Sequence, residues 1–319
     1  MKKAVFVSAL LALAVSAFAQ VDPNRTVATV DGVDIKGAEY YRRMEFLPGV
    51  GKDMGSGFAE FPPGFLTLEQ LITERLVFEL AKKKGVSPTE PEIQAEFDRR
   101  RQVNPKLLEQ WGSMGRTEAE LRYNIKFDLA QFKILTAGVT VTDQEIDQHY
   151  KNNPAEFTIP KQVRLRVIVV RSAEDAAKVD KELATKAFAD VAKAFSVDVT
   201  APQGGEYGTV PLTYLNEQVR KAVGATKTGA TTPWFPSANG TTQFKFLVEE
   251  IIPEKLQPLD ANVRFATRQR MMMDQGRIKN NIKKELDELR KTATIDIKEP
   301  TFAQAYKKYI DAYLANGKG

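Results

Sequence analysis

Apolar residues recur every three or four positions along residues 66–84, and Gly85 follows them. This spacing is typical of an amphipathic helix that buries one face, and glycine is a common stop signal. A further helix is expected to begin at Thr89, because threonine caps helix starts and Pro91 suits the first helical turn. This part of the chain is therefore interpreted as helical.

Short β-branched runs on either side of Asp31–Gly32 predict a hairpin, because Asp-Gly is a strong two-residue turn signal. A Gly- and Pro-rich stretch at 48–65 is expected to be a loop. The Thr-x-x-Glu sequences that begin at Thr117 and Thr142 are capping boxes, which mark two more helix starts. Residues 30–140 are thus expected to form a helical unit introduced by a hairpin.

The pattern changes at Pro160, after which an alternating and then fully apolar run predicts a strand that enters a core. In order, the expected elements are a strand at 163–170, two helices within 172–195, a short helix at 216–223 and a strand at 244–251. Residues 160–252 are therefore interpreted as a small α+β unit with a Gly-rich connection in its middle.

The rest of the chain returns to a helical pattern. Residues 261–292 are expected to form one long amphipathic helix with a largely solvated charged face. Its Met271–Met273 run either packs against other helices or offers an adaptable surface to a partner. A last strand is expected within 293–300 and a terminal helix at 301–315.

Residues 1–19 combine two lysines, an apolar run and Ala-Phe-Ala before Gln20, which is the pattern of a secretory leader and its cleavage site. A membrane anchor or core helix is the alternative, but the apolar run is short for a bilayer, so no membrane span is expected. Loss of Lys2 and Lys3 takes the net charge from +5 to +3. So small a charge argues against nucleic acid as a partner.

The sequence offers few groups for metal, thiol or triad chemistry. It has no cysteine, which excludes disulfides, a thiol nucleophile and zinc–cysteine sites. The single histidine, His149, lies in a polar helical segment and is expected to be a solvated or hydrogen-bonded surface residue. We therefore expect neither a metal nor a cofactor.

Three stretches together resemble the SurA/PrsA class of extracytoplasmic foldases. TVATVDGVDIKGAEYYRR, which begins at Thr26, resembles the hairpin and helix at the start of that class. VTDQEIDQHYKNNPAEFTIPKQVRLRVIVV, which begins at Val141, resembles the entry into its parvulin domain. AFSVDVTAPQGGEYG, which begins at Ala194, is similar to the parvulin segment that ends in Gly-Gly-Asp-Leu-Gly. The likeness extends over nearly the whole mature chain, except residues 300–319.

The resemblance implies an α+β protein. It would have a mostly α-helical chaperone domain, made of N- and C-terminal helices together, and a small parvulin-like domain with a central antiparallel sheet. The implied divisions are a signal peptide at 1–19, a helical chaperone domain at 20–142, a parvulin-like domain at 143–256, a returning helix and strand at 257–299, and a terminal helix or tail at 300–319.

In that family, two histidines and an acid or thiol form the polar network of a peptidyl-prolyl isomerase. The resemblance makes Asp198, at the acid position, the catalytic candidate. Val167 stands where the first histidine would be, and no histidine lies on the predicted last strand. The substrate-binding candidates are Val167, Ser196, Tyr214, Gln218, Trp234 and Phe235.

These residues also have structural interpretations. Asp198 is of a type common in caps and turns. Gly204 and Gly205 can supply backbone angles that are closed to other residues. Tyr214, Trp234 and Phe235 either line an apolar groove for a client segment or are ordinary core or surface aromatics.

The function implied by the resemblance is that of a protein-folding factor, a parvulin-type peptidyl-prolyl cis-trans isomerase and chaperone. It would be soluble in the periplasm or cell envelope, as a monomer or dimer, with unfolded or nascent exported polypeptides as partners. Two alternatives stay open, the first because of the absent histidines and the second because residues 300–319 lie outside the resemblance. One is a holdase chaperone with an inactive parvulin domain, and the other is an envelope scaffold.

Overall fold

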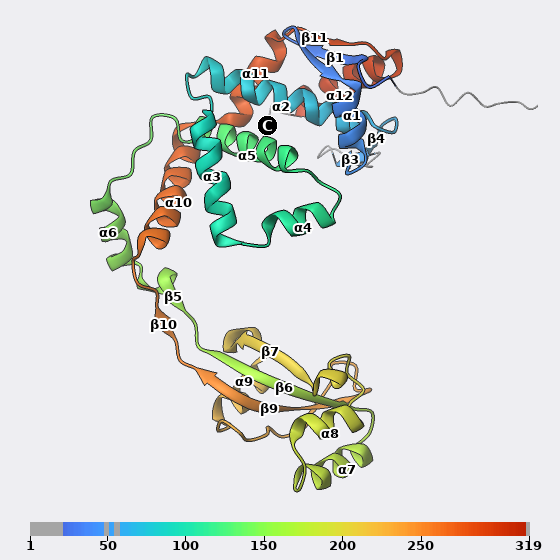
Figure 1. Ribbon diagram of the computed structural model, residues 1–319, viewed down its shortest axis with the longest axis vertical. Helices are drawn as coiled ribbons and strands as arrows, with labels where there is room; N and C mark the ends of the chain where they lie inside the picture. The colour runs from blue at the N-terminus through green and yellow to red at the C-terminus, as the bar shows by residue number, and fades with distance from the viewer. Residues whose placement is uncertain (1–21, 48–50, 54–57, 317–319) are drawn as a thin grey trace, which may run out of the picture. The chain divides into compact units, whose positions relative to one another are not determined.

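The computed structural model describes residues 22–47, 51–53 and 58–316. The leader predicted at 1–19 lies outside these residues. The chain divides into two compact units (Figure 1). The helical unit comprises the described residues up to Thr140 together with those from Arg270 onwards, and the sheet unit comprises Val141–Gln269. Among the described helices, none is long and apolar enough to cross a bilayer.

The helical unit is built around one central helix, α2. Its helices are α1 (Gly37–Met44), α2 (Phe65–Lys83), α3 (Glu90–Val103), α4 (Leu107–Ser113), α5 (Glu118–Leu135), α11 (Ile282–Thr292) and α12 (Pro300–Asn316). Leu68, Leu71, Ile72 and Leu76 of α2 are fully buried in the main core. The predicted periodicity of this segment is thus confirmed, and burial of its apolar side chains stabilises the unit.

The predicted helix starts are confirmed at atomic detail. At Thr89, Thr117 and Thr142 the threonine side chain accepts a hydrogen bond from the backbone N–H three residues later, and the glutamate there bonds back to the threonine N–H. At the other end of α2, Gly85 has a φ of 68°, the left-handed geometry of a helix stop.

Three short antiparallel strands in the order β11-β1-β2 form a small sheet in the helical unit. The strands are β1 (Thr26–Val30), β2 (Val33–Lys36) and β11 (Ile295–Ile297). Asp31 and Gly32 both have positive φ, 48° and 79°, as a tight hairpin turn requires. The predicted hairpin and last strand are therefore confirmed. Within the predicted loop at 48–65, β3 (Gly51–Asp53) pairs with β4 (Phe58–Glu60).

The long helix predicted at 261–292 is wrong in one respect, because it is two helices. α10 (Ala261–Lys279) ends before α11 begins. The Asn280 side chain donates to the backbone carbonyls of Leu135 and Ala137, at 2.7 and 3.1 Å, and Asn281 caps α11. Asparagine side chains that bond to the backbone compete with helix continuation, so the break has a local cause.

The terminal helix α12 packs on the start of α2. Tyr309 is 2% exposed, and its ring meets those of Phe65 and Phe61 edge to face at 5.8 and 5.7 Å. Ala305 and the fully buried Phe65 belong to the same apolar cluster. Through Ala305 and Tyr309, α12 is therefore part of the core of the helical unit.

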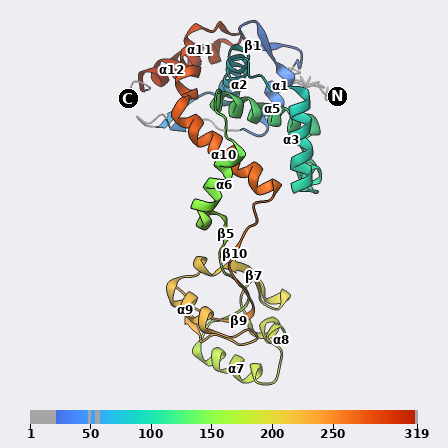
Figure 2. The ribbon, with the colours of Figure 1, turned by 90° about the vertical axis from the view of Figure 1, so that its left-hand side faces the viewer.

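The sheet unit has a four-stranded antiparallel sheet in the order β7-β6-β9-β8. Its strands are β5 (Thr158–Ile159), β6 (Gln162–Val170), β7 (Glu206–Pro211), β8 (Phe235–Pro236), β9 (Gln243–Ile252) and β10 (Lys255–Leu256), with β5 and β10 paired separately. Its helices are α6 (Asp143–Asn152), α7 (Ala173–Leu183), α8 (Phe188–Phe195) and α9 (Glu217–Ala225). α7 and α8 cover one face of the sheet and α9 the other (Figure 2).

The predicted order of elements omitted two strands of the four-stranded sheet, β7 and β8. β7 lies at the sheet edge and is mostly exposed or half-buried, so its sequence has no alternation of apolar and polar residues. β8 is only two residues long. The two strands that were predicted, β6 and β9, pair along their whole length.

Candidate functional site

The segment between Ser196 and Gly205 completes the edge of β6 that β7 leaves open. β7 pairs with β6 only as far as Arg166. Beyond that point, the Gly205 carbonyl accepts a hydrogen bond from the Val167 N–H at 2.7 Å. The Ser196 hydroxyl oxygen accepts one from the Val169 N–H at 3.1 Å. Ser196, predicted to bind substrate, therefore has a structural bond to the sheet.

The two glycines of this segment allow it to lie against the sheet. Gly204 and Gly205 have φ of 71° and 74°. A Cβ atom on Gly205 would lie 2.2 Å from the carbonyl oxygen of Val167, and one on Gly204 would lie 2.7 Å from the Cβ of Ala189. These are overlaps that no side chain can make, so the geometry favours the structural interpretation of the pair.

Asp198, the catalytic candidate, holds the turn that follows it. Its Oδ1 accepts hydrogen bonds from the N–H and the hydroxyl of Thr200, at 2.9 and 2.6 Å. Such an arrangement is typical of an aspartate that stabilises a turn. The residue is half-buried, and its catalytic role stays a prediction.

Aromatic rings surround Val167 on the face of the sheet that α9 covers in part. We call Val167, Tyr207, Phe235, Phe244 and Phe246 the aromatic face. Val167 is paired across the sheet with Phe246 and is 4% exposed. The ring centroids lie 5.5 Å apart for Phe235 and Phe244, 5.5 Å for Phe244 and Phe246, and 5.2 Å for Phe246 and Tyr207.

The aromatic face is suited to binding apolar groups. Its five side chains carry one polar atom, the Tyr207 hydroxyl. Tyr207 is 46% exposed and Phe244 is half-buried, so the outer part of the face is accessible to a ligand. Aromatic rings grouped in this way suit contact with an apolar ring such as that of proline. They do not supply a polar network for a reacting amide.

The other predicted substrate-binding residues lie elsewhere in the sheet unit. Tyr214 is 82% exposed, and Gln218 is exposed on α9. Trp234 packs on the opposite face of the sheet, in the cluster that α7 and α8 cover. Its Nε1 donates to Asp180 at 3.0 Å, and the Lys245 ammonium lies 5.0 Å from its ring centroid. The structure thus brings Phe235 to Val167 and leaves Trp234 apart.

The single histidine is a hydrogen-bonded residue of α6. His149 Nε2 lies 3.1 Å from a carboxylate oxygen of Glu156, and its Nδ1 lies 3.2 Å from the Asn153 amide nitrogen. Its ring meets Phe157 edge to face. This agrees with the interpretation of His149 as a hydrogen-bonded surface residue. Across the described chain, no group of three or more histidines and carboxylates is placed to hold a metal ion.

The helical unit contains a cavity of about 820 Å³ that sequence analysis did not predict. It lies among α1, α2, α3, α4 and α5, and its lining includes Phe46, Trp111, Tyr123 and Phe127. Its volume falls within the range of about 300–1,000 Å³ typical of ligand pockets. Five arginines and four carboxylates also line it, namely Arg42, Arg43, Arg75, Arg100, Arg116, Glu39, Glu74, Glu120 and Asp128.

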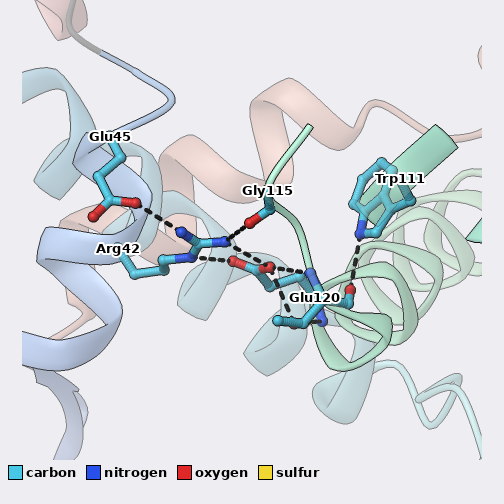
Figure 3. A network of polar contacts seen from close by, with 6 residues as sticks. Arg42, Glu45, Trp111, Gly115 and Glu120 are labelled. Atoms are coloured by element: carbon cyan, nitrogen blue, oxygen red, sulfur yellow. Dashed lines mark hydrogen bonds and ion pairs between the residues drawn. The ribbon is translucent and has the colours of Figure 1, made fainter. Parts of the chain in front are cut away.

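Arg42 fixes one wall of this cavity by joining α1 to the turn between α4 and α5 (Figure 3). Its guanidinium donates to Glu120 at 2.8 Å, to Glu45 at 2.7 Å, and to the Gly115 carbonyl. Trp111 Nε1 donates to the carbonyl of Thr117 at 2.8 Å. The turn that follows α4 is therefore tied to α1 and to the start of α5.

Acid is expected to loosen this turn. The bond from Arg42, with those from Thr117, lowers the pKa of Glu120 to about 2, below its ordinary value of 4.5. A lowered folded-state pKa gives stability that is present above about pH 4.5 and is lost as the pH falls toward 2. A Glu120→Gln chain should therefore unfold more readily than wild type at pH 7, with the difference narrowing by pH 3.

The measurement is urea unfolding followed by Trp111 fluorescence in a Trp234→Phe background. Glu118→Gln is the matched control, because Glu118 lies in the same helical turn and, among the described residues, forms its ion pair with Arg122 of its own helix. A difference between wild type and Glu120→Gln that stays constant from pH 7 to pH 3 would contradict the assignment.

Residues 141–264 match the family model described as the PPIC-type PPIASE domain. The sheet unit is a parvulin domain. The matched segment begins where the sheet unit begins and includes β6, β7, β8 and β9.

Curated relatives extend the likeness beyond the parvulin domain. The foldase protein PrsA of Clostridium botulinum strain Loch Maree is 28% identical over 249 residues, which cover 73% of this chain and 72% of that protein. PrsA of Caldanaerobacter subterraneus is 27% identical over 219 residues, with 64% and 67% covered. YacD of Bacillus subtilis, whose name describes a peptidyl-prolyl cis-trans isomerase, is 28% identical, but the chain spans only 62% of its length. These relatives confirm the SurA/PrsA-like resemblance.

Sequence analysis predicted some residues of the aromatic face and missed others. Val167 and Phe235 were predicted and lie together on the aromatic face. Tyr207, Phe244 and Phe246 were missed. For the last two the signal was present, because residues two apart on a strand share a face.

Proposed function

We propose that this protein is an exported folding factor of the SurA/PrsA kind that binds unfolded or nascent polypeptides, and that its parvulin domain recognises their prolyl segments through the aromatic face. The leader pattern at residues 1–19 supports export to the periplasm or cell envelope. The parvulin family match and the PrsA relatives support the folding role. The protein needs neither metal nor cofactor for it.

The aromatic face is the observation on which this proposal depends. Prolyl isomerisation breaks no bond but must cross a barrier of about 18–20 kcal/mol, which reflects loss of amide resonance. An apolar surface that holds the proline ring contributes to catalysis by binding the substrate. A polar network that stabilises the twisted amide contributes further, and each factor of ten in rate needs about 1.4 kcal/mol.

The isomerase activity of this chain is expected to be low. Val167 occupies the position at which the resembled family has a histidine, and the surrounding rings add only the Tyr207 hydroxyl. Each buried hydrogen bond that is lost costs about 1–3 kcal/mol. The rate should therefore fall by roughly one to three decades relative to a parvulin with the full network.

A second candidate is a holdase chaperone whose parvulin domain binds without catalysing. One observation favours it: the Oδ1 atom of Asp198 is engaged by Thr200. A carboxylate oxygen that already accepts hydrogen bonds within a turn is less available to interact with the amide of a bound prolyl peptide. The two candidates share the same partners and differ only in the rate at which a bound prolyl bond isomerises.

Two assays on the mature chain, residues 20–319, test the proposal. We expect suppression of aggregation of an unfolded exported protein at near-stoichiometric ratios, with weak acceleration of isomerisation of a prolyl peptide. Asp198→Ala should lower the residual isomerisation more than it lowers aggregation suppression. Asp198→Asn is the matched control, because its amide oxygen can still accept from Thr200.

Three results would decide between the candidates. If both Asp198→Ala and Asp198→Asn lose isomerisation, the charge of Asp198 has a role in catalysis. If only Asp198→Ala is affected, and it loses isomerisation and aggregation suppression equally, Asp198 serves only to stabilise the turn. No acceleration in the wild type leaves the holdase. Failure to suppress aggregation at all would contradict the folding role itself.

A further inference from the structure

The cavity in the helical unit contains one arginine more than it has carboxylates. Four of its arginines are paired with its four carboxylates: Arg42 with Glu120, Arg43 with Glu74, Arg75 with Glu39, and Arg100 with Asp128. No lysine lines it. The charge of the fifth arginine, Arg116, is therefore not offset by the carboxylates of the lining.

Arg116 is held between two aromatic rings. Its guanidinium carbon lies 4.5 Å from the ring centroid of Phe46 and 4.8 Å from that of Trp111. Among the residues that the structure describes, no carboxylate forms an ion pair with it. Stacking on rings orients a guanidinium and leaves its N–H edge free to donate.

The backbone on either side of Arg116 is fixed as well. Its N–H donates to the Trp111 carbonyl at 3.2 Å, and Gly115 beside it has a φ of 73° and receives the Arg42 bond. Arg116 is half-buried, as are Phe46 and Trp111. A charged group that is preoriented and partly removed from water binds an opposite charge more strongly than a mobile surface arginine does.

We propose that this cavity binds an acidic side chain, flanked by apolar residues, of an unfolded polypeptide, and that Arg116 is the group that receives the carboxylate. The inference rests on the proposed folding function and names the chemistry of the segment it takes. Arginine matches a carboxylate with two parallel N–H···O bonds. The half-buried ring of Phe127, which also lines the cavity, offers contact area to the neighbouring side chains.

The charges of the lining favour a carboxylate over a more highly charged anion. A phosphate brings nearly two negative charges at neutral pH and would meet Glu39, Glu74, Glu120 and Asp128 with only one unpaired arginine. In an unfolded polypeptide, side chains supply more carboxylates than the C-terminus does, because the chain has many acidic residues and only one C-terminus. A basic segment would find no unpaired carboxylate among the described residues of the lining.

The test uses short peptides blocked at both ends, with one glutamate between phenylalanines, and an identical peptide with glutamine in its place. Binding to the mature chain is measured by titration calorimetry at low and high salt. We expect the glutamate peptide to bind about tenfold more tightly at low salt, the advantage of one oriented charge-assisted contact. That preference should shrink as salt rises.

Arg116→Gln should remove the preference and leave the glutamine peptide unaffected, whereas Arg116→Lys should keep part of it. Arg101→Gln is the matched control, because Arg101 also lies over a ring, that of Phe97, in the same unit but outside the lining. Thermal unfolding of each variant shows whether the turn is intact. A loss of affinity for both peptides in Arg116→Gln would reduce Arg116 to a packing residue and overturn the proposal.

Two further outcomes would overturn the proposal without touching the folding function. One is equal wild-type affinity for the two peptides, or no binding of either, in a chain that still suppresses aggregation. The other uses a third peptide, the glutamine peptide with its C-terminus left free. If this peptide bound more tightly than the blocked glutamate peptide, the cavity would bind chain ends and not acidic side chains. Absence of aggregation suppression, in contrast, contradicts the proposed function.

Discussion

Gly205→Ala is expected to destabilise the parvulin domain by about 4 kcal/mol, the upper range for a single substitution. The new Cβ would lie 2.2 Å from the Val167 carbonyl oxygen, in a backbone with a φ of 74°. The left-handed geometry alone costs roughly 1–2 kcal/mol. Relief of the overlap must also move Gly205 away from β6 and break its 2.7 Å hydrogen bond with the Val167 N–H.

Gly208→Ala is the matched control for this prediction. Gly208 also has a positive φ, 95°, and lies three residues further along, but a Cβ there would meet no atom within 4 Å. It should cost only the conformational part, roughly 1–2 kcal/mol. Each unit contains one of the two tryptophans, so Trp234 fluorescence in a Trp111→Phe background reports the parvulin domain alone. Equal losses in the two variants would show that the close approach to β6 is unimportant.

Removal of residues 300–319 should destabilise the helical unit by roughly 4 kcal/mol or more and leave the parvulin domain unchanged. The deletion removes Tyr309 and Ala305 and exposes Phe65, which is fully buried against them. Loss of one large buried aromatic side chain alone costs about 3–5 kcal/mol. Strand β11 ends before the deletion, so the three-stranded sheet is retained.

The measurement is denaturant unfolding followed separately at Trp111 and Trp234. Tyr309→Phe is the control for the deletion, since it keeps the ring and removes only the hydroxyl that accepts from Lys52 at 3.2 Å. It should cost about 1 kcal/mol. If the truncated chain unfolded at the wild-type midpoint when read at Trp111, α12 would not be part of the core.

Much of the fold could be predicted because its signals are local. The capping threonines of α3, α5 and α6 and the Asp31–Gly32 turn are each specified within four residues. The elements that prediction missed depend on distant partners. β7 is a strand because β6 lies beside it, and α10 ends because Asn280 bonds to backbone carbonyls at Leu135 and Ala137.

The candidate sites were predictable to different degrees. Val167 and Asp198 could be placed from the resemblance, because each has a position in its motif. The turn role of Asp198 depends on which way one carboxylate oxygen points, which sequence does not specify. The arginine-lined cavity gave no signal, because its ion pairs join residues as far apart as Arg42 and Glu120.

The pairing of β11 with β1 joins Ile297 to Ala28, near opposite ends of the chain. A polypeptide that is synthesised from its N-terminus cannot complete that sheet until β11 has been made. The parvulin domain lies wholly between the two strands and has its own core, so it can reach its final structure while the surrounding unit is still open. Assembly of this protein can therefore proceed from the inserted domain outwards, and β1, which already pairs with β2, gains its second neighbour β11 only after the parvulin domain has been made.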